Sequence, residues 1–389
     1  MVGIFFPKMF NFFNKKLEDE NGIKNALLVQ VINAFVIGVI YILLPLLMLE
    51  RKISVESMGL IFAILPLVTQ SNRLLFGIAS DYIGRKKFYW LNGLMNVVFL
   101  VTYYLAKSPF GFLLGKVGEG LRDASLWSVN RPYFMDHSQE KEKILIKFRG
   151  INSVFEALGV LSAGFLLTYL YYNKTLILLM ALSLLIFPCL KSLKDKKKGK
   201  INLGVVLQAL DFRQKSKNFK VFVAAFFLLG FAWGFTGGYI LPLFLKEAGM
   251  AIENIGIFLG IRMFLSGIFA YVFHSLWSGK KKILVGGLLI ALFLIMLPFS
   301  SPLILPLLII LTGMASGIAI AGRETIFTAI TDHNTLGRDI GILMIGAHVG
   351  MSITQACSGF MITWLGFSSI FFASAGFEIL FSWIAYYQF

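Results

Sequence analysis

The chain has 389 residues, of which 57% are hydrophobic and only 14% are charged. Soluble domains carry about 25% charged residues, so the composition excludes a soluble globular protein and makes the lipid bilayer the solvent. The net charge of +16 is not gathered on the basic face of a soluble domain, which excludes nucleic acid as a partner.

Apolar runs of about twenty residues recur along the whole chain, which is the length that a helix needs to cross a bilayer. Strands of a membrane barrel would instead alternate apolar and polar residues over about ten positions. The sequence therefore predicts an all-α membrane protein with twelve transmembrane helices. In chain order, the predicted spans are 25–49, 57–80, 88–106, 110–132, 145–172, 175–191, 219–244, 252–277, 283–300, 303–329, 339–363 and 366–387.

A polar, lysine-rich stretch from Lys191 to Lys220 separates the sixth span from the seventh. We interpret it as a linker between two groups of six helices. The predicted organisation is an N-terminal segment at 1–24, a first six-helix half at 25–190, a basic linker at 191–218 and a second six-helix half at 219–389.

Lysine and arginine are distributed unevenly between the two ends of the predicted spans. The N-terminal segment, the linker and the loops on their side carry 26 of these residues, and the opposite loops carry five. Cytoplasmic loops are enriched in basic residues. We therefore expect a multi-pass protein of the cell membrane with both termini and the linker in the cytoplasm.

The two predicted halves repeat each other's sequence features in the same order. Arg122-Asp123 in the fourth span corresponds to Arg323-Glu324 in the tenth. Other matches are Glu56 to Gly59 with Glu253 to Gly256, Gly84 to Lys87 with Gly279 to Lys282, and Asp136-His137 with Asp332-His333. Their nearly constant offset indicates two parallel repeats related by an axis along the membrane normal.

The loop between the second and third spans carries the most specific motif, formed by Gly77, Asp81, Gly84, Arg85, Lys86 and Lys87. It resembles the signature G-x-x-x-D-x-x-G-R-[KR]-[KR] of the major facilitator superfamily. The resemblance implies a transporter working by alternating access, in which the aspartate belongs to a cytoplasmic charge cluster that locks one state. We expect Gly77 to allow a close helix contact and Gly84 to permit a tight turn.

Ionisable side chains inside a membrane are costly and usually mark a substrate or proton pathway. The family resemblance implies that the first, fourth, seventh and tenth helices line a central cavity, where Arg122-Asp123 and Arg323-Glu324 would come from opposite halves. The alternative is that these pairs are structural contacts between helices. The candidate substrate or proton site is Arg122, Asp123, Glu119, Glu156, Arg323, Glu324 and His348.

Proton coupling requires a carboxyl group that is not permanently ionised. Glu119 has Lys116 and Arg122 within one helical turn, whereas Glu156 has no basic residue within a turn. We expect Arg122 to point away from its neighbour Asp123. Glu156 is thus the first candidate and Asp123 the second; the alternatives are a permanent ion pair at Glu156 and a helix-packing role for His348.

The sequence favours a secondary active transporter of a small molecule, with protons as the expected coupling ion. No G-x-x-x-x-G-K-[ST] loop is present, so ATP is not the expected energy source. The four histidines are scattered and Cys189 and Cys357 form no metal motif, so we expect neither an enzyme nor a metal or cofactor site. An uncoupled uniporter and a non-transporting membrane receptor or sensor are the alternatives.

Overall fold

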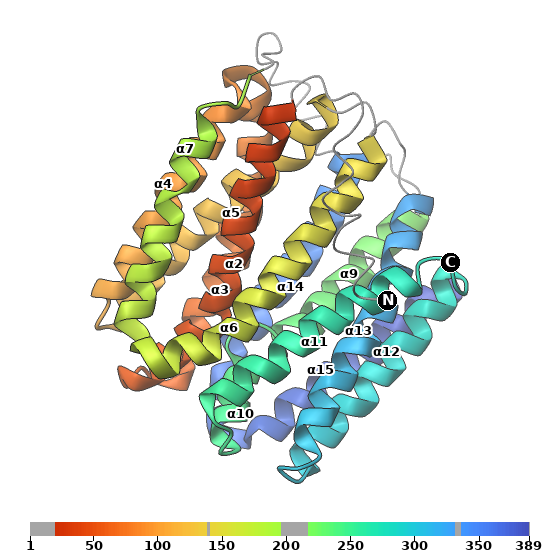
Figure 1. Cartoon of the computed structure of the whole chain (residues 1–389). Coiled ribbons are helices and arrows are strands. Elements are labelled where there is room, and N and C mark those ends of the chain that lie inside the picture. The colour runs from red at the N-terminus through yellow and green to blue at the C-terminus, as the bar shows by residue number, and fades with distance from the viewer. Residues whose placement is uncertain (1–19, 138–140, 196–216, 331–335, 389) are drawn as a thin grey trace.

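The computed structural model describes residues 20–137, 141–195, 217–330 and 336–388, and the regular elements there are helices (Figure 1). The N-terminal half contains α2 (Glu20–Glu50), α3 (Val55–Ile83), α4 (Arg85–Leu105), α5 (Pro109–His137), α6 (Lys141–Leu184) and α7 (Ile186–Leu190). The C-terminal half contains α9 (Lys217–Gly234), α10 (Ile240–Glu247), α11 (Ile252–Val272), α12 (Gly279–Met296), the 3-10 turn η2 (Leu297–Phe299), α13 (Leu305–Ile330), α14 (Leu336–Leu365) and α15 (Phe367–Gln388).

Each predicted span coincides with one helix or with consecutive helical segments of the described chain. Within that part, eight helices are long and apolar enough to cross a membrane. The charge-rich α5 is not among them. The predicted fold class is confirmed. Residues 1–19, most of the predicted linker (196–216) and the Asp332-His333 pair lie outside the described residues.

Two predicted spans are built from helices that bend or break. Tyr171 in α6 has a positive φ of 59°, which interrupts the helix where the fifth span turns back into the sixth. The seventh span breaks between α9 and α10, where Gly238 has φ 62°. Only glycine adopts this conformation without strain. The seventh span therefore breaks within the glycine-rich stretch Gly230–Pro242.

Large apolar side chains cover the outer faces of the bundle. Leu303 is 89% exposed, and Leu75, Phe110, Leu184 and Trp364 are also exposed. In water such a surface would be unfavourable, whereas lipid tails solvate it. The exposed apolar faces are therefore the lipid-facing surfaces of the helices.

The two halves lie side by side, with α3 packed on α14 and α6 packed on α11 (Figure 1). At one end of these helices the backbones touch: a Cβ on Gly359 would lie 2.4 Å from the Val55 carbonyl, and one on Gly164 would lie 2.7 Å from the Ile252 carbonyl. Nearer the other end, a Cβ on Gly150 would have no neighbour within 4 Å. The halves therefore pack tightest at the end opposite the Asp81–Lys87 loop.

Arg51 follows α2 at this tightly packed end. Its guanidinium donates to the carbonyls of Tyr103 (2.8 Å) and Tyr104 (3.2 Å) at the end of α4, and to Asn173 Oδ1 at 3.1 Å. Burial lowers the pKa of Arg51, while the nearby Glu50 raises it. Because arginine starts from so high a pKa, the side chain stays charged and caps the last turn of α4.

Candidate functional site

Helix α5 carries the first buried ion pair, between Lys116 and Glu119. The two residues lie one turn apart, and Lys116 Nζ is 2.8 Å from Glu119 Oε2. Tyr103 of α4 donates its hydroxyl to the same oxygen at 2.6 Å, and Lys116 lies 4.2 Å from the centre of the Phe62 ring. Both charged side chains are only 3% exposed. This pair is neutralised and enclosed within the N-terminal half.

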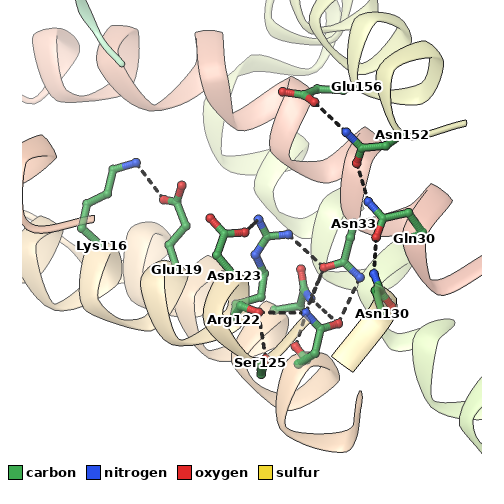
Figure 2. A network of polar contacts seen from close by, with 12 residues as sticks. Gln30, Asn33, Lys116, Glu119, Arg122, Asp123, Ser125, Asn130, Asn152 and Glu156 are labelled. Atoms are coloured by element: carbon green, nitrogen blue, oxygen red, sulfur yellow. Dashed lines mark hydrogen bonds and ion pairs between the residues drawn. The ribbon is translucent and has the colours of Figure 1, made fainter. Parts of the chain in front are cut away.

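One turn further along α5, Arg122 pairs with the adjacent Asp123 (Figure 2). Arg122 Nη2 lies 2.5 Å from Asp123 Oδ1, so the expectation that Arg122 points away from Asp123 is wrong. The long guanidinium curls back along the helix because Asn33 of α2 accepts from its Nη1 at 2.9 Å. Asp123 retains 19% exposure of its side chain, against 3% for Arg122.

Asn33 is the centre of a buried amide cluster that joins three helices. Its Oδ1 accepts from Arg122, from Asn92 at 3.1 Å and from Asn96 at 2.9 Å. Its Nδ2 donates to Asn92 Oδ1 at 3.0 Å. The asparagines are fully or almost fully buried. Since buried polar groups must be paired, this cluster fixes the relative positions of α2, α4 and α5.

Glu156 in α6 stands at the end of a second chain of side-chain amides (Figure 2). Asn152 donates to Glu156 Oε2 at 3.2 Å, and Gln30 of α2 donates to Asn152. Asn130 of α5 donates to Gln30 at 2.6 Å, and Tyr89 of α4 donates to Asn130, also at 2.6 Å. This chain of hydrogen bonds joins four of the helices in the N-terminal half: α2, α4, α5 and α6.

Among the described residues, Glu156 makes no ion pair, unlike Glu119 and Asp123. It lies where α2 and α6 cross in close contact, since a Cβ on Gly38 would lie 2.2 Å from the Glu156 carbonyl oxygen. Its backbone is thus fixed while its carboxyl holds a single amide donor. The alternative of a permanent ion pair finds no partner in the described part of the chain.

The second predicted pair, Arg323-Glu324, is divided between two contacts. Arg323 turns into the C-terminal half, where it lies 4.0 Å from Glu378 and 5.4 Å from the centre of the Trp233 ring. Glu324 turns toward the N-terminal half and meets Arg149 of α6 at 2.5 Å. The expectation that both residues face a common cavity opposite Arg122-Asp123 is therefore wrong, because adjacent residues on a helix project to different sides.

His348 in α14 is bound to its own helix. Its Nδ1 lies 2.7 Å from the carbonyl oxygen of Met344, one turn earlier. The charged residue in its vicinity is Arg73 of α3. The structure thus favours the helix-packing alternative for His348.

A cavity of about 60 Å³ opens inside the C-terminal half, and Arg262 of α11 lines it together with Arg323, Trp233 and Glu378. Arg262 Nε donates to Thr312 Oγ1 of α13 at 3.2 Å. Sequence analysis gave Arg262 no role. A single arginine in the centre of an apolar span is the sequence signal that could have identified it.

The Asp81–Lys87 loop forms a charge cluster at one end of the N-terminal half. Arg85 bridges Asp81 at 3.1 Å and Asp136 of α5 at 2.6 Å. The Lys86 ammonium donates to the Lys191 carbonyl at 3.0 Å, and the Lys86 backbone N–H donates to Asp195 at 2.8 Å. Sequence reasoning missed Asp136 and Asp195 as partners, because both lie far away along the chain.

The two glycines of the motif behave differently. Gly84 has φ 98° and ends α3, so the predicted tight turn is confirmed. An added Cβ there would also lie 2.4 Å from Asp195 Oδ2. Gly77 has no atom within 4 Å of the same position, so the close helix contact expected there is absent from this structure.

The family profile described as "Major Facilitator Superfamily" matches residues 26–280 and again residues 222–388. The chain belongs to the major facilitator superfamily. It is 23% identical over 350 residues to an uncharacterized MFS-type transporter of Methanocaldococcus jannaschii, covering 85% of this chain and 88% of that one.

Solved major facilitator structures share the fold along nearly the whole chain. The nucleoside transporter NupG superposes with a TM-score of 0.75 at 17% identity, covering 95% of this chain and 100% of NupG. A bacterial homolog of the human lysosomal transporter Spinster, in an inward-facing and unoccupied conformation, gives 0.77 at 14% identity, covering 96% and 98%.

Membership in the major facilitator superfamily makes this chain a multi-pass membrane transporter of a small solute and not an enzyme. Fold likeness at this low identity carries no information about which solute is bound. The arrangement of charges in this chain is therefore the basis for any further assignment.

Proposed function

We propose that this protein is a secondary active transporter that couples solute movement to protons through Glu156. The supporting observation is that Glu156 lies near the middle of a membrane-spanning helix without a cationic partner among the described residues. A carrier driven by protons must bind a proton in one state and release it in another. A carboxyl group held only by an amide is suited to both states.

The other intramembrane carboxylates are less suited to this role because each has a cation close by. Glu119 is held by Lys116, Asp123 by Arg122, and Glu324 by Arg149. Glu378 faces Arg323 at 4.0 Å. Each of these carboxylates is thus already engaged by a cation, whereas Glu156 has no such partner among the described residues.

Alternating access is supported by the matched contacts between the halves at one end. Gly359 of α14 packs against Val55 and Glu56 of α3, and Gly164 of α6 packs against Ile252 and Glu253 of α11. Each contact joins one half to the other, and the two occupy corresponding positions in the repeats. In our proposal residues 1–190 rock against residues 219–389, and these contacts close the external end.

The charge cluster of Asp81, Arg85 and Asp136 lies at the opposite end, which we assign to the cytoplasm of the cell membrane together with both termini. All three residues belong to the N-terminal half. No atom lies within 4 Å of a Cβ placed on Gly77, so a helix of the C-terminal half could pack against the motif there. We propose that it does so when the cytoplasmic end closes, which is the state that the cluster would lock.

Transport into proteoliposomes tests the coupling. A solute found to stabilise the purified protein should accumulate when a pH gradient is imposed, and Glu156→Gln should abolish that accumulation while sparing exchange without a gradient. Glu247→Gln, at an exposed position outside the membrane, is the matched control. A wild-type protein that ignores the gradient would instead be a uniporter.

Thiol labelling tests the orientation. In a background with Cys189 and Cys357 replaced by alanine, a cysteine at Lys86 should resist an impermeant reagent added outside intact cells. A cysteine at Lys246, exposed in the last turn of α10 at the opposite end, should react. Labelling of the first position and protection of the second would reverse the assignment.

A further inference from the structure

Arg262 lies at the centre of α11, ten residues from either end of the helix. At 1.5 Å per residue, that is about 15 Å of helix on each side, more than an arginine side chain spans. The guanidinium therefore cannot reach either membrane surface. A charge at this depth is unfavourable unless it faces a partner or a polar cavity, and such residues usually lie on a substrate pathway.

The neighbouring helix α13 fixes the direction of this side chain. A Cβ on Gly313 would lie 2.8 Å from Arg262 Cγ and 2.3 Å from the Arg262 carbonyl oxygen, so only glycine leaves room for this approach. The adjacent Thr312 accepts from Arg262 Nε at 3.2 Å. Both contacts hold the base of the side chain, and its terminal nitrogens have no hydrogen-bond partner in the described part of the chain.

An arginine has five N–H donors in a rigid fork. Arg262 uses one of them toward Thr312 and makes no ion pair with the described residues. By contrast, Arg122 bonds to Asp123 and Asn33. The fork of Arg262 is thus available to a ligand.

The cavity beside Arg262 has a net positive charge. It contains the guanidiniums of Arg262 and Arg323 and one carboxylate, Glu378. Its volume of about 60 Å³ exceeds the 10–15 Å³ or so that one water requires on this measure. Thr236 and Ser316 add hydroxyl groups to its lining, and Trp233 adds an aromatic wall. A small anionic group matches the size, charge and donors of this space.

Tyr41 of α2 is partly buried between charged residues of the two halves. It lies within electrostatic range of both Arg262 and Glu156, although these residues belong to opposite halves of the molecule. A change of charge at Arg262 or at Glu156 would therefore be felt at the same side chain.

We propose that Arg262 binds the carboxylate of a small organic anion, which makes the transported solute a carboxylate. This inference rests on the proposed transport function and specifies its substrate class. The planar guanidinium binds a carboxylate through two parallel hydrogen bonds. One carboxylate neutralises the single excess charge of the cavity.

Binding to the purified full-length protein tests this assignment. Succinate and lactate should raise the unfolding temperature and change the fluorescence of Trp233, with a Trp233→Phe protein as the blank. Succinamide and lactamide, matched in shape but uncharged, should do neither. Arg262→Gln should weaken carboxylate binding about ten- to a hundredfold, and Arg262→Lys should retain part of it.

Two further variants separate possible causes of failure. Gly313→Ala retains the charge but displaces the side chain, so it should also weaken binding. Glu247→Gln, at an exposed position outside the membrane, should leave binding unchanged. If the protein binds carboxylates but shows no proton-driven accumulation, proton coupling is rejected and the carboxylate site at Arg262 is retained.

The assignment would be overturned by any of three results: wild-type protein that binds neither carboxylate, amides or inorganic phosphate that bind as well as the carboxylates, or Arg262→Gln protein that binds them undiminished. Proton-driven accumulation together with one of these results would preserve the coupling and remove Arg262 from the substrate site.

Discussion

The two halves of the molecule treat their buried charges in opposite ways. In the N-terminal half, Lys116 and Arg122 each lie within 2.8 Å of a carboxylate, and the Asn33 cluster surrounds the second pair. In the C-terminal half, Arg323 is 4.0 Å from its carboxylate, and the one hydrogen-bond partner of Arg262 among the described residues is the Thr312 hydroxyl. Lys116 and Arg122 in the N-terminal half are thus tightly paired with carboxylates, whereas Arg262 and Arg323 in the C-terminal half are held more loosely.

This difference separates charges that hold the fold from charges that are available to a solute. When one partner of a closely spaced buried ion pair is substituted, the folded state is strongly destabilised, because the other charge is left buried and uncompensated. A charge that already lacks a close partner loses less when it is removed. Stability measurements should therefore respond to the N-terminal pairs, whereas ligand binding should respond to Arg262.

The largest effect on stability is expected for Lys116→Met. The substitution leaves Glu119 buried with Tyr103 as its remaining donor, and breaking such a pair costs about 3–5 kcal/mol. Chemical unfolding of the purified protein measures the loss. Adding Glu119→Met should recover most of it; a double variant that is less stable than Lys116→Met would contradict the pairing.

A smaller loss is expected for Asn33→Ala in the amide cluster. The change removes the acceptor shared by Arg122, Asn92 and Asn96, and leaving buried donors unpaired costs about 1–3 kcal/mol. In the C-terminal half, Ser374→Ala removes a single bond to the Ala232 carbonyl and should cost about 1 kcal/mol. If the two variants lost equal stability, the proposed difference between the polar contacts of the two halves would be contradicted.

The contacts between the halves can be tested within one helix. Gly164→Ala places a methyl group against the Ile252 backbone, and overpacking of this kind costs about 1–3 kcal/mol. We expect slower transport and increased labelling of that end by an impermeant thiol reagent. Gly150→Ala, in the same helix but beside open space, should leave both measurements unchanged.

The smallest effect is expected at the signature loop. Asp195→Ala removes the carboxylate that accepts from the Lys86 backbone N–H at the start of α4, and the loss of such a cap costs about 0.5–2 kcal/mol. Because Asp195 is exposed, the lower end of this range is expected from chemical unfolding. A loss as large as that of Lys116→Met would show that the loop holds the fold.

The fold was predictable from the sequence because the bilayer imposes a length on every apolar segment. The turn signals also lay in the chain itself: Gly84 and the Gly230–Pro242 stretch mark where helices end or bend. The predicted spans placed the reversal near Tyr171 correctly. They did not predict its positive φ, because tyrosine has no preference for that conformation.

The site was less predictable because its contacts join residues distant in the chain. Arg85 meets Asp136, and Glu324 meets Arg149. Helical spacing identified the ionisable residues but could not tell which way a long guanidinium turns, so Arg122 and Arg323 were both placed wrongly. The absence of a local cation drew attention to Glu156, which has no ion-pair partner among the described residues. The contacts of Arg262 became visible only with the position of α13.

Proton flux into proteoliposomes tests the central claim, that a carboxylate and a proton move together, most directly. A pH-sensitive dye inside the vesicles reports protons when succinate is added outside, with protein-free vesicles as the blank. Our account predicts that wild-type protein acidifies the lumen, whereas Glu156→Gln and Arg262→Gln proteins do not. Succinate entry without acidification, or acidification that persists in Glu156→Gln, would contradict it.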